Sequence, residues 1–430
     1  MNDIEALAES QLSDKHYLQS VTHLGDTRSI VANREIYTST GMKLIGAGMQ
    51  INSALYDRLL QHKLVPPLDQ SLTVEDAVNG ASLVEQATRM MQEDKQLALI
   101  QSVKSDGQTL ASVLKQVPLN PAIAFKLTVM RETNIELFKR SIFVALVSIY
   151  IGMKVHMDKN QLKDLATAAL LHDIGLLHLD PKLLERGYKM SEPERRHLYV
   201  HSVTGWMILK TYPEYRKRVL DAVLQHHERL DGSGYPRGLK SGEIAQFAQI
   251  IAVAEIVASR YGSDNDAYSW SRLETILKLN LRRYGRNLIP CLKIFYQDEV
   301  EAPPCSEIDM QAALEKMTRI SHIFSDWEKA RKECDVKIPA CAFIDERMSN
   351  LKMEIIDAGL NPYVEDNQLF GLEGDAEACF DARMLLDETM WQISNILREM
   401  QRRWPSVDSE EPLSGFKAAK AWMGEVKTLL

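Results

Sequence analysis

Apolar residues recur at helical spacing almost without interruption from 122 to 297, and this pattern constrains the fold more than any other feature. Turn signals break it at Gly187, at 232–234 and at Gly262, and no alternating strand pattern occurs within it. Its most apolar part, 141–153, is about 20 Å long as a helix, against roughly 30 Å for a bilayer core. We therefore expect an all-helical central domain in which 141–153 is a buried core helix, and no membrane span.

The N-terminal third has a different pattern. Residues 1–30 are polar without a clear period and suggest a leader or docking segment. Short runs at 36–38 and 42–45, separated at Gly41, predict a β-ribbon, and a helix should follow Asn52. Helical spacing then returns, with breaks near 105–107 and at two prolines.

The C-terminal third is predicted to be helical as well. A run of acids and prolines at 299–304 is the best linker in the chain. Beyond it a heptad-like stripe favours a bundle helix over a coiled coil, because it is short; its members are Leu386, Met390, Ile393, Leu397 and Met400. The predicted fold is thus mainly α, in four segments: an accessory segment with β-ribbon and helix (1–70), a helical connector (71–124), the central domain (125–300) and a C-terminal helical region (301–430).

Charge and cysteine content exclude several classes of protein. Fifty-nine acidic and 51 basic residues give a net charge of −8, which argues against a surface built to coat DNA or an anionic membrane. The five cysteines are odd in number and never in C-x-x-C spacing, so a disulfide scaffold or zinc ribbon is not expected. No export signal is visible at the N-terminus, and we expect a cytoplasmic protein.

Histidines cluster in the central domain. Six of the eleven lie between 172 and 227. The pair His172-Asp173 ends an apolar helix, where successive side chains can be aimed at one point, and His226-His227 precedes a glycine-rich turn. Imidazole and carboxylate together hold divalent ions. We interpret His178 and His197, by contrast, as ordinary surface or core histidines.

Five short motifs follow one another in an order that is similar to a known family. They are Leu171-His172-Asp173-Ile174-Gly175, His201-Ser202-Val203-Thr204-Gly205, His226-His227-Glu228, Asp231-Gly232-Ser233-Gly234-Tyr235-Pro236 and Ile251-Ala252-Val253-Ala254-Glu255. Together they resemble the HD-GYP family within the HD phosphohydrolase superfamily. That family consists of bacterial metal-dependent phosphodiesterases that hydrolyse cyclic di-GMP. The resemblance covers about 125–300, and its most specific part is the run from His226 to Pro236.

The resemblance implies a fold and a site. The fold would be a central all-helical HD-type bundle holding two divalent ions, iron or manganese given the mixed imidazole and carboxylate donors. The implied metal ligands are His172, Asp173, His201, His226, His227 and Glu255, with Asp173 bridging and with His172 and Asp173 as the catalytic pair. The substrate would be a cyclic dinucleotide, contacted by Gly234, Tyr235 and Arg237. The Gly-Tyr-Pro loop would also dock signalling proteins.

Four positions depart from the family pattern. Arg140 stands where the first ligand histidine is expected, and an arginine does not ligate metals but can clamp a phosphate. Leu176 replaces a lysine, and Glu255 replaces an aspartate ligand. Past Glu255, the stretch 258–265 lacks the family's further aspartate and arginines.

These departures leave two hypotheses open. The first is a metal-dependent cyclic di-GMP phosphodiesterase with a partly eroded site. The second is a catalytically weak or inactive signalling module that binds nucleotide, metal or protein. The sequence also leaves a homodimer open.

Overall fold

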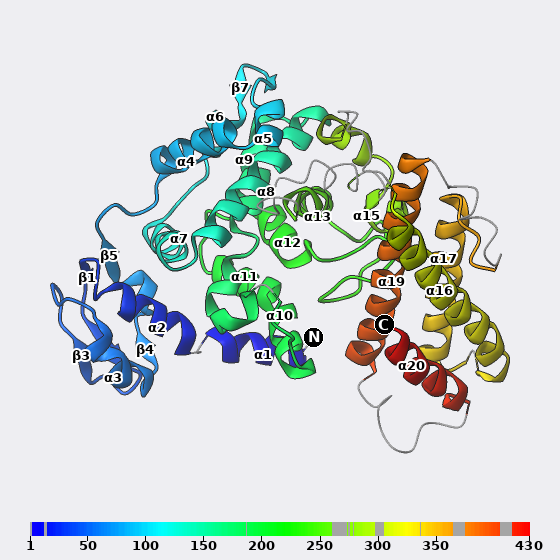
Figure 1. Ribbon diagram of the computed structural model, residues 1–430. Helices are drawn as coiled ribbons and strands as arrows, with labels where there is room; N and C mark the ends of the chain where they lie inside the picture. The colour runs from blue at the N-terminus through cyan, green and yellow to red at the C-terminus, as the bar shows by residue number, and fades with distance from the viewer. Residues whose placement is uncertain are drawn as a thin grey trace. The chain divides into compact units, whose positions relative to one another are not determined.

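The computed structural model describes residues 2–12, 15–185, 187–259, 273, 276–277, 279–296, 305–335, 337–363, 375–404 and 415–430. The chain divides into two compact units, Met1–Gly262 with Arg283–Phe295, and Ser263–Arg282 with Tyr296–Leu430 (Figure 1). The four segments drawn from the sequence stay a prediction. The linker expected at 299–304 and the departures at 260–265 lie outside the described residues.

The first unit opens with two helices where the sequence suggested an aperiodic leader. They are α1 (Asn2–Leu12) and α2 (Lys15–Leu24). Ala8 of α1 is fully buried against Val203 and Leu224, and Tyr17 and Val21 of α2 are also buried. Helices this short are marginal alone, so packing rather than periodicity stabilises them. The sequence therefore did not predict these two helices, and the interpretation of this region as a leader or docking segment stays a prediction.

Two small antiparallel sheets follow. The predicted β-ribbon is confirmed as β2 (Ile36–Thr38) paired with β3 (Lys43–Ile45), and β4 (Leu64–Val65) extends it on the other side. The second sheet pairs β1 (Ile30–Ala32) with β5 (Leu72–Val74). These additional strands have two or three residues each, too few for alternation to reveal them. Between the strands lie η1 (Ser53–Leu55), α3 (Tyr56–Leu60) and η2 (Leu68–Gln70).

Helices form in the segment predicted as a connector, and the break predicted at 105–107 is a β-hairpin. The helices are α4 (Gly80–Glu93), α5 (Lys95–Ile100) and α6 (Leu110–Leu114). The hairpin joins β6 (Lys104–Ser105) to β7 (Gln108–Thr109) through Asp106 and Gly107, whose φ angles are 48° and 74°. Two successive positive φ angles match the turn type that suits a two-residue hairpin.

The centre of this unit is all-helical, as predicted. Its elements are α7 (Pro121–Thr133), α8 (Ile135–Lys154), α9 (Lys159–Leu171), η3 (Ile174–His178), η4 (Pro181–Leu184), α10 (Glu192–Tyr199), α11 (His201–Leu209), α12 (Lys217–Gln225), α13 (Gln246–Ala258), α15 (Leu281–Tyr284) and η5 (Ile289–Phe295). Every residue from Ser141 to Met153 is buried, so α8 is the core helix expected from its composition. Helices α7, α9 and α13 pack around it (Figure 1). Among the described helices, none is long and apolar enough to cross a bilayer.

The second unit is a helical bundle with its own core. Its long helices are α16 (Glu307–Glu333), α17 (Pro339–Asp357), α19 (Ala376–Arg403) and α20 (Lys417–Leu429). The heptad-like stripe lies on α19 and packs into this core, as a bundle helix would. A single disulfide joins Cys305 to Cys379, although the odd cysteine count gave no hint of a pair.

Candidate metal centre

Three of the predicted ligand histidines stand where a helix ends. His172 is the C-cap of α9, His226 is the C-cap of α12, and His201 follows the last turn of α10. The last carbonyls of a helix lack a partner within the helix. A histidine at this position can donate to one of them and direct its second ring nitrogen away from the helix.

Each of these histidines makes that bond. The Nδ1 atom donates to the carbonyl three residues earlier, over 2.8 Å for His172, 2.5 Å for His201 and 2.7 Å for His226. A carbonyl only accepts, so the proton is assigned to Nδ1 and the Nε2 lone pair is free for a metal. Backbone contacts of this kind hold the rings of metal-binding histidines in place. The acceptors are Ala169, Leu198 and Val223.

The first set of converging donors is the histidine-rich group, which consists of Asp173, His201, His226 and His227. One ligand atom from each lies within 4.8 Å of the others. His201 Nε2 lies 3.2 Å from Asp173 Oδ1, 3.3 Å from His226 Nε2 and 3.1 Å from His227 Nε2. Bonds of about 2.1 Å around one ion give donor–donor distances of roughly 3.0–3.4 Å. The spacing of this group therefore fits one divalent ion.

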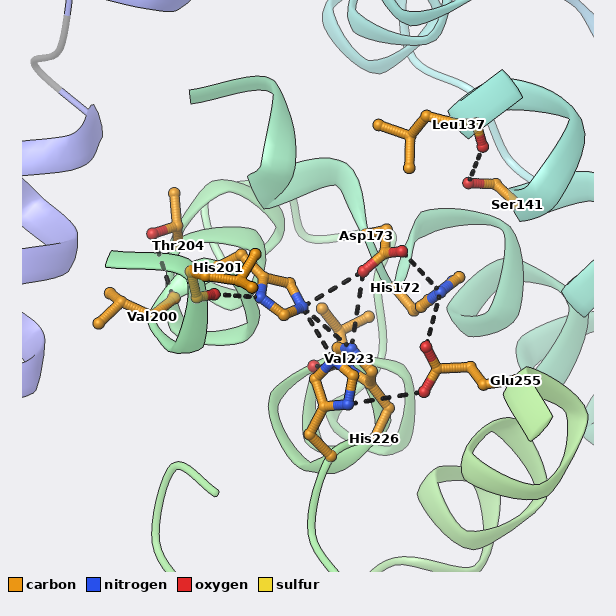
Figure 2. Close-up of polar contacts among 12 residues, drawn as sticks. Leu137, Ser141, His172, Asp173, Val200, His201, Thr204, Val223, His226 and Glu255 are labelled. Carbon is orange, nitrogen blue, oxygen red and sulfur yellow. Dashed lines mark hydrogen bonds and ion pairs between the residues drawn. The ribbon is translucent and has the colours of Figure 1, made fainter. Parts of the chain in front are cut away.

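The second set is the carboxylate-rich group, which consists of His172, Asp173 and Glu255. Its ligand atoms also lie within 4.8 Å of one another. His172 Nε2 is 3.1 Å from Asp173 Oδ2 and 3.7 Å from Glu255 Oε1 (Figure 2). His172 Nε2 and Glu255 Oε2 are buried and make no hydrogen bond to any described residue. Buried polar atoms without partners are costly, and a cation between them would remove that cost.

Burial and neighbouring charges set the protonation of the donors. Burial alone would raise the pKa of Asp173, but His172 and His201 hold that pKa well below its usual value. Burial, and then the neighbouring histidines, lower the pKa of His226 and of His227 well below the usual range. Burial is the main cause that raises the pKa of Glu255. An ionised Asp173 together with neutral His226 and His227 imidazoles can bind a cation without these groups first releasing protons.

Gly175 brings the two ligand segments together. A Cβ built on Gly175 would lie 2.0 Å from the His201 carbonyl oxygen and 2.8 Å from the Gly205 nitrogen. Only a residue without a side chain lets η3 approach the start of α11 this closely. The glycine after the His-Asp pair therefore determines how near Asp173 comes to His201.

A cavity of about 880 Å³ opens onto the metal centre. Its lining includes Asp173, His201, His227 and Glu255 together with Arg140 and Tyr235. Arg140 Nη2 lies 3.7 Å from Glu255 Oε1, and 42% of the Arg140 side chain is exposed. The Tyr235 ring stacks on His227 with 4.6 Å between ring centroids. These two predicted substrate contacts therefore line one cavity with the ligands.

Gly234 and Arg237, also predicted to contact substrate, are not among the residues that line this cavity. Gly234 is buried, and a Cβ there would lie 2.4 Å from the His227 carbonyl oxygen, so it allows the loop to pack on 227–229. Arg237 is exposed, and its backbone N–H donates to Glu228 Oε1 over 2.7 Å. The sequence reasoning missed Glu228. Its buried carboxylate also accepts from the Leu239 N–H and so anchors the Gly-Tyr-Pro loop. The one feature of the sequence that could have indicated this role is the position of Glu228 directly after the histidine pair.

Comparison with known proteins agrees with this geometry. Residues 119–286 match the family model of the HD domain. A cyclic di-GMP phosphodiesterase of Pseudomonas aeruginosa, PA4108, is 26% identical over 39% of this chain and 40% of its own length. The predicted ligand motifs and the Gly-Tyr-Pro loop lie within residues 119–286, the range that matches the HD-domain model. The central region belongs to the HD-GYP family.

Two other relatives are named after different substrates, 3'3'-cGAMP and cyclic di-GMP. A 3'3'-cGAMP-specific phosphodiesterase 3 of Vibrio cholerae is 39% identical over 21% of this chain and 20% of its own length. A cyclic di-GMP phosphodiesterase of Thermotoga maritima is 34% identical over 24% of this chain and 29% of its own length. The chain thus spans well under half the length of each of these relatives.

The positions that depart from the family pattern also face this site. Leu176 and Arg140 both line the cavity, so the place of the expected lysine is apolar. Glu136 lines the cavity too, but its side chain is 71% exposed and lies 3.6 Å from the Lys139 ammonium. The cavity wall therefore contains predicted ligands, and a leucine stands where the resemblance implies a lysine.

Proposed function

We propose that this chain is a metal-dependent phosphodiesterase of the HD-GYP type that hydrolyses cyclic di-GMP. The observation that carries the proposal is the position of Asp173, whose two carboxylate oxygens serve two converging donor groups at the edge of one cavity. A shared carboxylate of this kind is how paired metal ions are held in phosphoester hydrolysis. The relatives' names support the substrate class.

The residues of both groups would hold two divalent ions, iron or manganese. When bound, such ions neutralise phosphoryl charge and lower the pKa of water, which makes it a nucleophile at neutral pH. The chain's own contribution is orientation. Backbone carbonyls fix His172, His201 and His226, and Asp173 stays ionised between them.

Arg140 and Tyr235 would bind the substrate. The Arg140 guanidinium lies at the cavity wall beside Glu255, where its remaining N–H groups can reach a phosphate in bidentate fashion. The Tyr235 ring offers an aromatic face next to the metal centre. Gly234 and Arg237 would act indirectly, through the shape of the loop that carries Tyr235.

The test is metal content together with turnover. The chain purified with Mn²⁺, or anaerobically with Fe²⁺, should hold more than one ion and hydrolyse cyclic di-GMP, with 3'3'-cGAMP as the comparison substrate. The double variant His172→Ala with Asp173→Ala should bind no metal. Less than one ion per chain and no turnover of either dinucleotide would contradict the proposal.

The second candidate is a weak or inactive signalling module that binds a nucleotide or a protein through the Gly-Tyr-Pro loop. The specific observation in its favour is the apolar Leu176 in the cavity lining, where a lysine would have added positive charge. This candidate predicts metal and dinucleotide binding without turnover, so the same experiment separates the two functions.

A further inference from the structure

The N-terminal helices contact both segments that carry the metal ligands. Helix α1 packs on α11, the helix that begins with His201, and α2 packs on η3, the turn that follows Asp173. Residues 2–24 lie more than 140 positions away from these segments in the sequence. Their contact with the ligand segments is therefore a consequence of the tertiary fold alone.

Gln11 makes the polar part of the first contact. Only 1% of Gln11 is exposed, and its Nε2 donates to the His197 carbonyl over 2.7 Å. Its Oε1 accepts from the Thr204 hydroxyl, also over 2.7 Å. Both functions of a fully buried amide are thus satisfied by the helices on either side of His201, which fixes the position of each.

The end of α10 shows why this contact matters for the ligand. The last turn of α10 presents two adjacent carbonyls, and the Val200 N–H donates to both of them at the helix end. The Leu198 carbonyl accepts from His201 Nδ1, and the His197 carbonyl beside it accepts from Gln11. Gln11 therefore holds the backbone that aims the His201 ring (Figure 2 shows His201 and Thr204 on one turn).

A second contact links α2 to the other ligand segment. The Tyr17 ring stacks on His178, at the end of η3, with 4.7 Å between centroids. The buried Lys126 ammonium lies 3.8 Å from the Tyr17 ring centroid and 3.4 Å from His178 Nε2. Asp69 Oδ2, 3.3 Å away, balances that charge. This buried cluster fixes α2 to the turn that starts at Asp173.

We propose that Gln11 is a positioning residue for the metal centre, and that α1 and α2 form a brace that sets the distance between Asp173 and His201. The inference rests on the proposed metal centre but not on the identity of the substrate. Helices α1 and α2, which precede the β-sheets, then contact the segments that carry the predicted ligands. A change in the docking of α1 alters metal affinity, because His201 lies at the end of the hydrogen bonds that Gln11 controls.

The experiment measures Mn²⁺ affinity by titration calorimetry on the full chain, with thermal melting in parallel. Gln11→Ala should weaken Mn²⁺ binding by about tenfold, as outer contacts of metal ligands do. Gln19→Ala is the matched control, because Gln19 is exposed on α2, and it should stay within about twofold. Thr204→Val should weaken binding, and Thr204→Ser, which keeps the hydroxyl, should restore it.

A double-mutant cycle locates the effect at His201. In a His201→Ala background, Gln11→Ala should have no further effect on Mn²⁺ affinity, because the ring it positions is gone. An equal loss in both backgrounds, or wild-type affinity in a folded Gln11→Ala chain, would overturn the brace alone. A wild-type chain that binds no Mn²⁺ would overturn the metal centre and the brace with it.

Discussion

The histidine-rich group and the carboxylate-rich group share Asp173 but differ in their remaining donors. The first adds three imidazoles, two of them held by backbone carbonyls. The second adds one imidazole and Glu255, whose Oε1 lies 3.7 Å from the Arg140 guanidinium. A fixed positive charge beside a ligand atom opposes the arrival of a cation. We therefore expect the histidine-rich group to bind its ion more tightly.

This difference indicates that the arginine at position 140 can weaken metal binding by the carboxylate-rich group alone. Arg140 lies on α8, outside the helix ends that carry the histidines, so the histidine-rich group does not depend on it. We therefore expect Arg140 to lower the affinity of the carboxylate-rich group for its ion while the histidine-rich group is unaffected. Four substitutions test this comparison, beginning with the largest effect.

Asp173→Asn should weaken metal binding by the histidine-rich group and by the carboxylate-rich group together. The amide has no charge and loses the shared carboxylate, so metal binding and turnover should fall by at least about 100-fold. Metal analysis and a turnover assay measure this. Asp57→Asn, on the exposed face of α3, is the control and should behave as wild type. Retention of one tightly bound ion in Asp173→Asn would show that the two groups are independent.

Gly175→Ala should damage the histidine-rich group first. Its Cβ would lie 2.0 Å from the His201 carbonyl oxygen, so η3 and α11 must separate, at a cost of roughly 1–3 kcal/mol in stability. Thermal melting and Mn²⁺ titration measure both consequences. The matched control is Gly424→Ala in α20, where a Cβ meets nothing within 4 Å and helix propensity should add about 1 kcal/mol. Unchanged metal affinity in Gly175→Ala would contradict the close approach.

Arg140→His should strengthen the carboxylate-rich group. It removes the positive charge beside Glu255 and adds a ring nitrogen, so the second Mn²⁺ should bind about tenfold more tightly, which is about 1.4 kcal/mol. Arg140→Gln removes the charge without adding a good ligand and should give a smaller gain. Calorimetric titration resolves the two ions. If neither variant alters the weaker of the two affinities, Arg140 is not what distinguishes the groups.

Tyr235→Ala should have the smallest effect, on substrate rather than metal. Loss of the ring stacked on His227 should raise the KM for cyclic di-GMP by roughly threefold to tenfold and leave Mn²⁺ affinity unchanged. Tyr235→Phe keeps the ring and should stay within about twofold of the wild-type KM. A loss of metal from Tyr235→Ala would mean that the ring supports His227 instead.

Local patterns in the sequence were enough to predict the helical class, and the resemblance to the HD-GYP family supplied the candidate ligands. The apolar run 141–153 is a buried core helix, and the stripe on 386–400 is a bundle helix, because both signals persist over several turns. The additional strands β1, β4 and β5, the single disulfide and the helices α1 and α2 carry no such signal. Their formation depends on partners that are far away in the sequence.

The sequence by itself predicted which residues would hold metal: the His-Asp pair, the later histidines and Glu255 stand at recognisable spacing, and the structure brings them into two converging groups. Only the tertiary structure decided how they act together. It gives Asp173 a place in both groups, and it sets Arg140 against Glu255. It also forms the hydrogen bond from Gln11 to the end of α10, between residues 186 positions apart. Spacing along a chain cannot encode such distances, because they depend on how helix ends meet in the folded core.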